Sequence, residues 1–266
     1  MSINLVRIAA LTTGVALLVA VAALARSSDV ARIGRYEAGN LVIIDRGGIS
    51  PERLPRHRQA PVRANLHGRI LTKDGSHLPA AKELNINFDR TLELNPKGLP
   101  TCSARQLEAR SSDAVKRICP EAIVGTGSAE VEVAFPDQKP FRATGPLVAF
   151  NGGSHGRTTL LLIHAYIDVP APTAVVVKAR VTKVDNGRFG MNAVVEIPPI
   201  AGGAGSVTGF DLQLGRKFKH RGKRVSYLTA SCPTGRYRVE GHVRFSDGTV
   251  IRITHMPPNR VGSFVR

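Results

Sequence analysis

Tryptophan is absent from this chain of 266 residues, and aromatic side chains make up only 5% of it. Four tyrosines and nine phenylalanines remain. Aromatic rings are the usual surfaces on which sugars and unpaired bases stack. The composition therefore argues against a sugar-stacking platform and against nucleic acid as a specific partner.

Cysteine is scarce as well, with only Cys102, Cys119 and Cys232 in the chain. No C-x-x-C or H-x-x-x-H spacing accompanies them, which argues against a zinc site. An odd count leaves one cysteine over in an oxidising compartment. A bridge between Cys102 and Cys119 closes a 17-residue loop and is worth roughly 3 kcal/mol in the chain-entropy model. Cys232 is then a buried core residue, a free thiol or an intermolecular link, and burial is the ordinary state of an unpaired cysteine.

Acidic residues are few, because 20 Asp and Glu stand against 37 Lys and Arg, and the formal net charge is +17. Such a charge gives affinity for nucleic acid, anionic lipid headgroups and acidic envelope polymers, and it does not choose among them. The alternative interpretation is solubility through net charge. The glycine-rich stretch 202–206 is not followed by Gly-Lys-Ser or Gly-Lys-Thr, so it is no phosphate-binding loop, and we expect no cofactor.

Only one apolar run approaches membrane length, and it lies at the N-terminus. Arg7 precedes the apolar residues 8–25, which end in Ala23-Leu24-Ala25. A charged n-region, an apolar h-region and a small-x-small site are the parts of a secretory signal. If residues 1–25 are not removed, the same run, at the lower limit for spanning a bilayer, becomes an N-terminal anchor. In both cases we expect the rest of the chain to be extracytoplasmic, either secreted or held at the outer face of the membrane.

The remaining chain divides by composition into three parts. Residues 26–60 are basic and contain Pro and Gly, which predicts a linker, although the apolar residues 41–44 can pair as a strand. Residues 61–256 form the expected β domain, and residues 257–266 a C-terminal tail.

Alternation of apolar and polar residues from about residue 61 predicts an all-β domain. Apolar side chains occupy every second position in the runs 129–135, 175–182, 210–214 and 237–245, as in antiparallel strands with one face on a core. Turn-forming residues separate the expected strands at Asp74-Gly75, Asn151-Gly152-Gly153, Asn186-Gly187, Arg221-Gly222 and Asp247-Gly248. We therefore expect an antiparallel β-sandwich of about ten or eleven strands.

Residues 103–118 are the expected exception, a small helical insertion. Ser103 and Ser112 can each cap a helical turn. Leu107, Ala114, Val115 and Ile118 supply apolar contacts, and Cys102 and Cys119 staple the insertion to the sheets.

Six short motifs relate the chain to a known family: Asp74-Gly75-Ser76; Gly98-Leu99-Pro100-Thr101-Cys102; Cys119-Pro120 with Gly125 and Gly127; Gly145-Pro146-Leu147-Val148-Ala149-Phe150-Asn151-Gly152; Tyr227-Leu228 with Ser231-Cys232-Pro233; and Phe245-Ser246-Asp247-Gly248-Thr249. With these motifs, residues 61–258 resemble a family of uncharacterised secreted proteins of actinobacteria. The resemblance implies a signal peptide followed by a β-rich domain, and no assigned activity. The family pattern has a fourth cysteine near the C-terminus, where this chain reads Pro257-Pro258-Asn259-Arg260, so the resemblance implies that Cys232 lacks a partner.

A serine nucleophile is one candidate for catalysis. Residues 152–156 fit the pattern G-x-S-x-G, in which a strand–turn–helix elbow exposes the serine, here Ser154. His155, His164 and Asp168 are the candidate partners for general base catalysis. The residues after Ser154 resemble a strand better than a helix, and a hairpin explains the glycines without chemistry. A secreted serine hydrolase is therefore kept as the alternative function, and a non-enzymatic module is preferred.

Two stretches carry the densest positive charge. Residues 216–224 form an expected hairpin tip with Arg216, Lys217, Lys219, Arg221, Lys223 and Arg224. Alternation in the last two strands places Arg236, Arg238, Arg244 and Arg252 on an outward face. Together these residues suggest a surface for anionic envelope polymers or lipid headgroups, and a solvated turn carrying excess charge is the alternative.

Overall fold

The computed structural model describes residues 33–168, 171–256 and 260–261. They belong to one of the two units into which the chain divides, residues 31–266. The expected secretory signal, residues 1–25, lies outside the described residues. Among the described residues, no helix combines the length and apolarity needed to cross a membrane.

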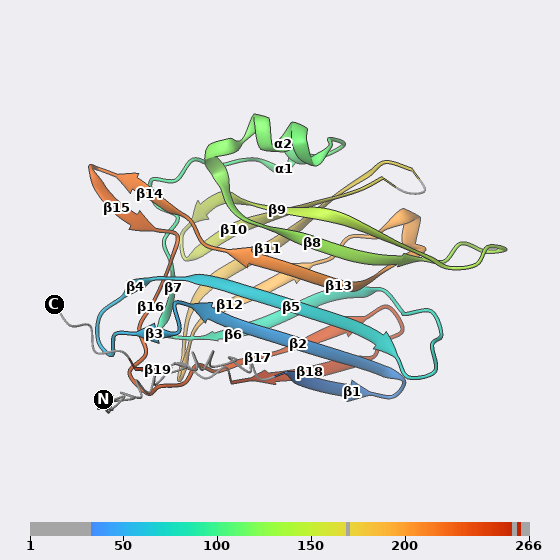
Figure 1. Ribbon diagram of the computed structural model, residues 1–266, viewed down its shortest axis with the longest axis horizontal. Coiled ribbons are helices and arrows are strands. Elements are labelled where there is room, and N and C mark those ends of the chain that lie inside the picture. The colour runs from blue at the N-terminus through green and yellow to red at the C-terminus, as the bar shows by residue number, and fades with distance from the viewer. Residues whose placement is uncertain (1–32, 169–170, 257–259, 262–266) are drawn as a thin grey trace, which may run out of the picture. The chain divides into compact units, whose positions relative to one another are not determined.

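The main element of the described chain is one twelve-stranded antiparallel sheet (Figure 1). Its strands, in order across the sheet, are β1 (Gly34–Ala38), β2 (Leu41–Ser50), β5 (Arg63–Thr72), β13 (Gly205–Leu214), β8 (Ile123–Val133), β9 (Phe141–His155), β10 (Thr158–Ile167), β11 (Thr173–Asn186), β12 (Phe189–Glu196), β6 (Ala81–Asp89), β17 (Val239–Phe245) and β18 (Val250–His255). The predicted all-β antiparallel fold is confirmed. Both layers of the sandwich come from this single sheet, which folds back on itself and nearly closes.

Alternating side chains fill the space between the two layers. On β8, Val131 and Val133 are buried while Glu130 and Glu132 lie on the outer face. On β11, Val175 and Ala179 are buried while Lys178 is exposed. Successive strand residues point to opposite faces, so each strand contributes every second side chain to the core. The predicted strand pattern is therefore confirmed at these runs.

Side chains close the seam between the two edge strands, β1 and β18, which lie beside each other without a backbone ladder. The Tyr36 hydroxyl on β1 donates a hydrogen bond to the Thr254 carbonyl on β18, 2.7 Å away. His255 Nδ1 lies 3.2 Å from Asp45 Oδ2 on β2. Beneath these contacts an apolar cluster includes Leu41 and Ile251. An edge covered in this way is protected from pairing with other chains.

Three small sheets lie at one end of the main sheet, at the left of Figure 1. The first is the hairpin of β14 (Lys217–His220) and β15 (Lys223–Ser226). The second places β16 (Leu228–Ala230) between β4 (Ala60–Pro61) and β7 (Leu92–Leu94). The third pairs β3 (Arg53–Leu54) with β19 (Arg260–Val261) in parallel.

The helical insertion covers the outer face of β9 and β10. It consists of α1 (Ala104–Leu107), α2 (Ser112–Ile118) and the 3-10 turn η1 (Pro120–Ala122); a second 3-10 turn, η2 (Ala201–Gly203), precedes β13. The expected disulfide joins Cys102 to Cys119, with their Cα atoms 5.9 Å apart. Leu107 and Val115 pack on Phe150 and its outward-facing neighbours on β9. Strand β9 is therefore buried on both faces, which explains its nearly continuous apolar sequence.

Several details differ from the sequence expectations. The expected linker, residues 26–60, contributes β1 and β2 to the main sheet, because the buried Leu41, Val42 and Ile43 pair with the end of β5. Residues 257–266, the expected tail, include β19, which pairs with β3.

The remaining differences concern single residues. Asn151-Gly152-Gly153 lies inside β9 and is not a turn; the chain reverses after His155. Ser111 caps α2 in place of Ser112, because the Ser111 hydroxyl accepts the Ala114 N–H. Ile118, an expected core contact, is 42% exposed.

Candidate polyanion-binding surface

The hairpin β14–β15 is built by its turn and by one apolar face. Arg221 and Gly222 have φ values of 50° and 75°, the left-handed pair that a tight two-residue hairpin requires. Phe218 packs against the main core. The His220 ring packs directly on Gly98, so a side chain at position 98 would displace the ring. One face of the hairpin is thus fixed to the domain, and the predicted hairpin at residues 216–224 is confirmed.

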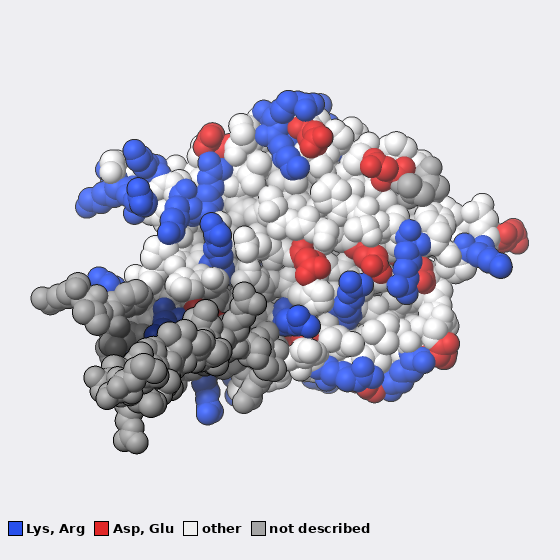
Figure 2. Space-filling view, in the orientation of Figure 1, with Lys and Arg blue, Asp and Glu red and all other residues white. Residues whose placement is uncertain are grey.

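Five basic side chains of this hairpin are exposed: Lys217, Lys219, Arg221, Lys223 and Arg224. We call them the hairpin cations. Lys219 and Arg224 are cross-strand partners and share the face opposite Phe218. Within the described residues, none of the five lies within 4.0 Å of a carboxylate oxygen. Figure 2 shows Lys and Arg side chains gathered over β14 and β15.

Arg216, also predicted to belong to this surface, has a structural role. Its Nη1 donates hydrogen bonds of 2.9 to 3.0 Å to the carbonyl oxygens of Pro120, Glu121 and Ile123. Its Nη2 lies 2.6 Å from Glu121 Oε2. The guanidinium therefore satisfies the carbonyl oxygens around η1 and is not free for a ligand.

Three of the four predicted arginines, Arg238, Arg244 and Arg252, do not join the hairpin, whereas Arg236 lies before β17 at the hairpin end of the domain. Arg238 forms an ion pair with Glu240, and Arg244 Nη2 lies 2.9 Å from Glu83 Oε2. Arg236 and Arg252 are exposed and without an ion pair among the described residues. In Figure 1, β17 and β18 lie apart from the hairpin, on the other side of β5 and β2. The single basic face expected from the sequence is therefore not formed.

Two cations that lie beside the hairpin were not predicted from the sequence. Lys97 precedes Gly98, on which His220 packs, and Arg63 lies against Gly215 at the base of the hairpin. Both side chains are exposed. The contacts join positions more than a hundred residues apart, so charge runs in the sequence give no signal for them.

The candidate nucleophile Ser154 lies at the end of β9, and β10 follows it. The helix that the nucleophile elbow requires is replaced by a hairpin. The Ser154 hydroxyl shares a hydrogen bond of 3.0 Å with Thr159. Within the described chain, neither His155 nor His164 bonds to Ser154. Asp168 is exposed beyond the opposite end of β10.

His164 is a buried structural residue beneath the helical insertion. It is fully buried, and its Nε2 donates to the Arg110 carbonyl over 2.9 Å. Its ring stacks on Tyr166 with ring centroids 6.5 Å apart. Burial lowers the pKa of His164, and the bond to Arg110 opposes this effect more weakly. The neutral imidazole therefore fastens the loop between α1 and α2 to β10.

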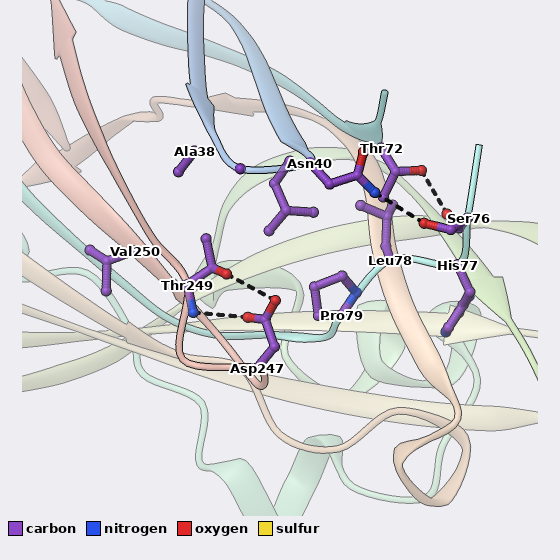
Figure 3. A pocket seen from close by; sticks show the side chains of 12 residues that line it. Ala38, Asn40, Thr72, Ser76, His77, Leu78, Pro79, Asp247, Thr249 and Val250 are labelled. Carbon is purple, nitrogen blue, oxygen red and sulfur yellow. Dashed lines mark hydrogen bonds between the residues drawn. The ribbon is translucent and has the colours of Figure 1, made fainter. Parts of the chain in front are cut away.

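The described chain also has an open hollow of about 470 Å³, shown in Figure 3. It lies between the turn at Asn40, the loop 72–79 and the turn at Asp247. Asn40 Nδ2 donates to Asp74, and this bond together with those from Ser76 lowers the pKa of Asp74 to about 2. Asp247 accepts the N–H and hydroxyl of Thr249, each at 2.9 Å. These polar groups hold the turns themselves, so they form no convergent ligand site.

Comparison with known protein families, curated proteins and solved structures finds no match for this chain. The resemblance to secreted actinobacterial proteins therefore stays an expectation. The class of protein that the structure defines is an all-β domain with a disulfide-stapled helical insertion. Its most distinctive surface is the group of hairpin cations.

Proposed function

We propose that this protein is a non-enzymatic extracytoplasmic module that binds an anionic polymer of the cell envelope through the hairpin cations. One observation carries the proposal. Arg216, Arg238 and Arg244 are neutralised by nearby carboxylates, whereas within the described residues the five hairpin cations have no such partner. Unpaired cations on one rigid hairpin concentrate positive potential where a polyanion can reach it.

The shape of the surface favours an extended polymer over a small ligand. The hairpin protrudes from the end of the sheet, and the hollow of Figure 3 is lined by residues of other turns. A protruding basic ribbon binds through charge and released counterions, so its affinity falls steeply with salt and is insensitive to monomer order.

Two features favour an extracytoplasmic location, which in turn favours an envelope ligand. The Cys102–Cys119 disulfide is typical of oxidising compartments. The apolar N-terminal segment with its Ala-Leu-Ala site is typical of export. Teichoic-type chains, acidic polysaccharides and other wall polymers present repeated anionic groups in such compartments.

Retention on a heparin column tests the proposal. The variant Lys217→Gln, Lys219→Gln, Arg221→Asn, Lys223→Gln and Arg224→Gln removes all hairpin cations, and Asn keeps the left-handed turn. We expect this hairpin variant to elute well below about 150 mM salt and the wild type well above it.

A matched control separates a defined surface from net charge. Glutamine replaces Arg35, Lys73, Arg142, Arg180 and Arg244, five exposed cations that are all ion-paired. The control loses the same charge and is expected to elute close to the wild type. Equal loss of retention in both variants, or none in the hairpin variant, would overturn the proposal. Retention by anionic vesicles but not by heparin would assign the surface to lipid headgroups instead.

A further inference from the structure

A second group of exposed cations lies at the same end of the domain as the hairpin. It consists of Arg56 and Arg58 in the loop before β4, Lys97 in the loop after β7, and Arg236 before β17. Among the described residues, no carboxylate forms an ion pair with any of the four. We call them the loop cations.

Backbone hydrogen bonds fasten these loops to the chain that follows the hairpin. The Cys232 N–H donates to the Pro55 carbonyl at 2.8 Å. The Asn95 N–H donates to the Tyr227 carbonyl at 2.8 Å, and the Tyr227 N–H donates to the Arg216 carbonyl at 2.7 Å. Hairpin cations and loop cations are therefore carried by adjoining segments.

The loops are anchored to the core. Leu54 is fully buried and Pro55 is buried directly before Arg56. Leu99 is buried two residues after Lys97. Cations on anchored backbone lose less conformational freedom on binding than cations on a loose tail, which preorganises the surface for a ligand.

Acidic residues at this end already have partners. Asp89 Oδ2 lies 2.9 Å from Arg188, Glu121 binds Arg216, and Glu240 binds Arg238. Glu93 accepts a hydrogen bond from Gln59 at 3.3 Å. At the opposite end, the turns and loops carry four exposed carboxylates, Asp74, Asp137, Asp168 and Asp247, together with the exposed cations Lys73 and Lys139. Within the described residues, cations without a carboxylate partner are thus more numerous at the hairpin end.

We propose that the hairpin cations and the loop cations form one footprint for a linear chain of phosphate groups, longer than the hairpin alone can engage. This inference rests on the proposed function and adds the chemistry and length of the ligand. Five of the nine cations are arginines, namely Arg56, Arg58, Arg221, Arg224 and Arg236. The planar guanidinium fork binds phosphate oxygens in pairs, so a chain with a phosphate in every unit can engage these arginines one after another.

Inorganic polyphosphate of graded length is the probe. Dissociation constants are measured at about 150 mM salt for tripolyphosphate and for chains of several tens of phosphates. The loop variant carries Arg56→Gln, Arg58→Gln, Lys97→Gln and Arg236→Gln, all at exposed positions. We expect its Kd for the long chain to rise at least about tenfold, and its slope of log Kd against log salt to fall by up to about 3. Its Kd for tripolyphosphate should equal that of the wild type.

The control variant replaces Arg35, Lys73, Arg142 and Arg180 by glutamine and should bind long chains within about twofold of the wild type. Thermal unfolding of all variants confirms that each is folded. If the loop variant binds long chains like the control while the hairpin variant does not, the extended footprint is wrong and the hairpin proposal stands. If the hairpin variant also binds every chain like the wild type, the proposed function itself fails.

Discussion

At the scale of single residues, Asn151 shows why a turn-like motif lies inside a strand. It is 1% exposed, and its Nδ2 donates to the Leu99 carbonyl at 3.2 Å and to the Pro100 carbonyl at 3.1 Å. Its Oδ1 accepts the Gly153 N–H at 3.2 Å. One side chain therefore binds β9 to the loop that leads into Cys102.

We expect Asn151→Ala to lower the free energy of unfolding by about 2 kcal/mol or more, because buried carbonyls lose their donor. Urea unfolding measures the change. Asn65→Ala is the control, since Asn65 is exposed and should cost less than about 0.5 kcal/mol. Equal costs at the two positions would show that Asn151 does not hold the loop.

Cys232 is a second residue whose state the fold determines. It is 1% exposed and unpaired, and burial raises the pKa of its thiol. Both effects slow the reaction of the thiol with alkylating reagents. We therefore expect iodoacetamide to leave the native protein unmodified and to label one cysteine after unfolding without reductant. Peptide mapping identifies the labelled site. Rapid labelling of the native protein, or no labelling after unfolding, would contradict a buried and unpaired Cys232.

At the scale of elements, the seam between β1 and β18 contains an ion pair that depends on pH. His255 is 6% exposed; its Nδ1 faces Asp45 on β2 and its Nε2 donates to the Gly47 carbonyl at 3.2 Å. Tyr36 on β1 lies near Asp45, and burial with that carboxylate raises the pKa of Tyr36 to about 12. The hydrogen bond to Asp45 raises the pKa of His255, which burial opposes.

A histidine with a raised pKa in the folded state stabilises the fold fully below its unfolded pKa of about 6.5. This stabilisation is lost as pH rises through the folded pKa. We expect the stability difference between the wild type and His255→Gln, measured by urea unfolding from pH 5.5 to 9, to shrink as pH rises. A difference that stays constant or grows with pH would contradict the role of the charged pair.

Local sequence patterns predicted where strands lie better than they predicted which strands and side chains contact one another. The alternation at residues 129–135 and 175–182 predicts β8 and β11, because one face of each lies on the core. Gly47, Gly48 and nearby charges suggested a linker, whereas β2 is stabilised by pairing with β5 along its length. Likewise, Arg221-Gly222 predicts the basic hairpin, but Glu121, which neutralises Arg216, is 95 residues away. Contacts of this kind depend on the completed fold.

At the scale of the whole described domain, charge is distributed unevenly between the two ends of the sheet. The hairpin and the loops that carry the loop cations adjoin the small sheets at one end (Figure 1), whereas Asp74, Asp137 and Asp247 lie in turns and loops at the other. An extended polyanion is therefore expected to approach the domain at its basic end.

The salt dependence of polyanion binding tests the central claim most directly. Kd for heparin is measured between about 50 and 300 mM salt for the wild type, the hairpin variant and its charge-matched control. Binding of the hairpin variant releases fewer counterions than binding of the wild type, because the variant has fewer cations to place against the polymer. We therefore predict that the hairpin variant loses affinity and that its slope of log Kd against log salt falls by about 3 or more. The control should keep the wild-type slope. Identical slopes for the hairpin variant and the control would contradict a defined binding surface on β14 and β15.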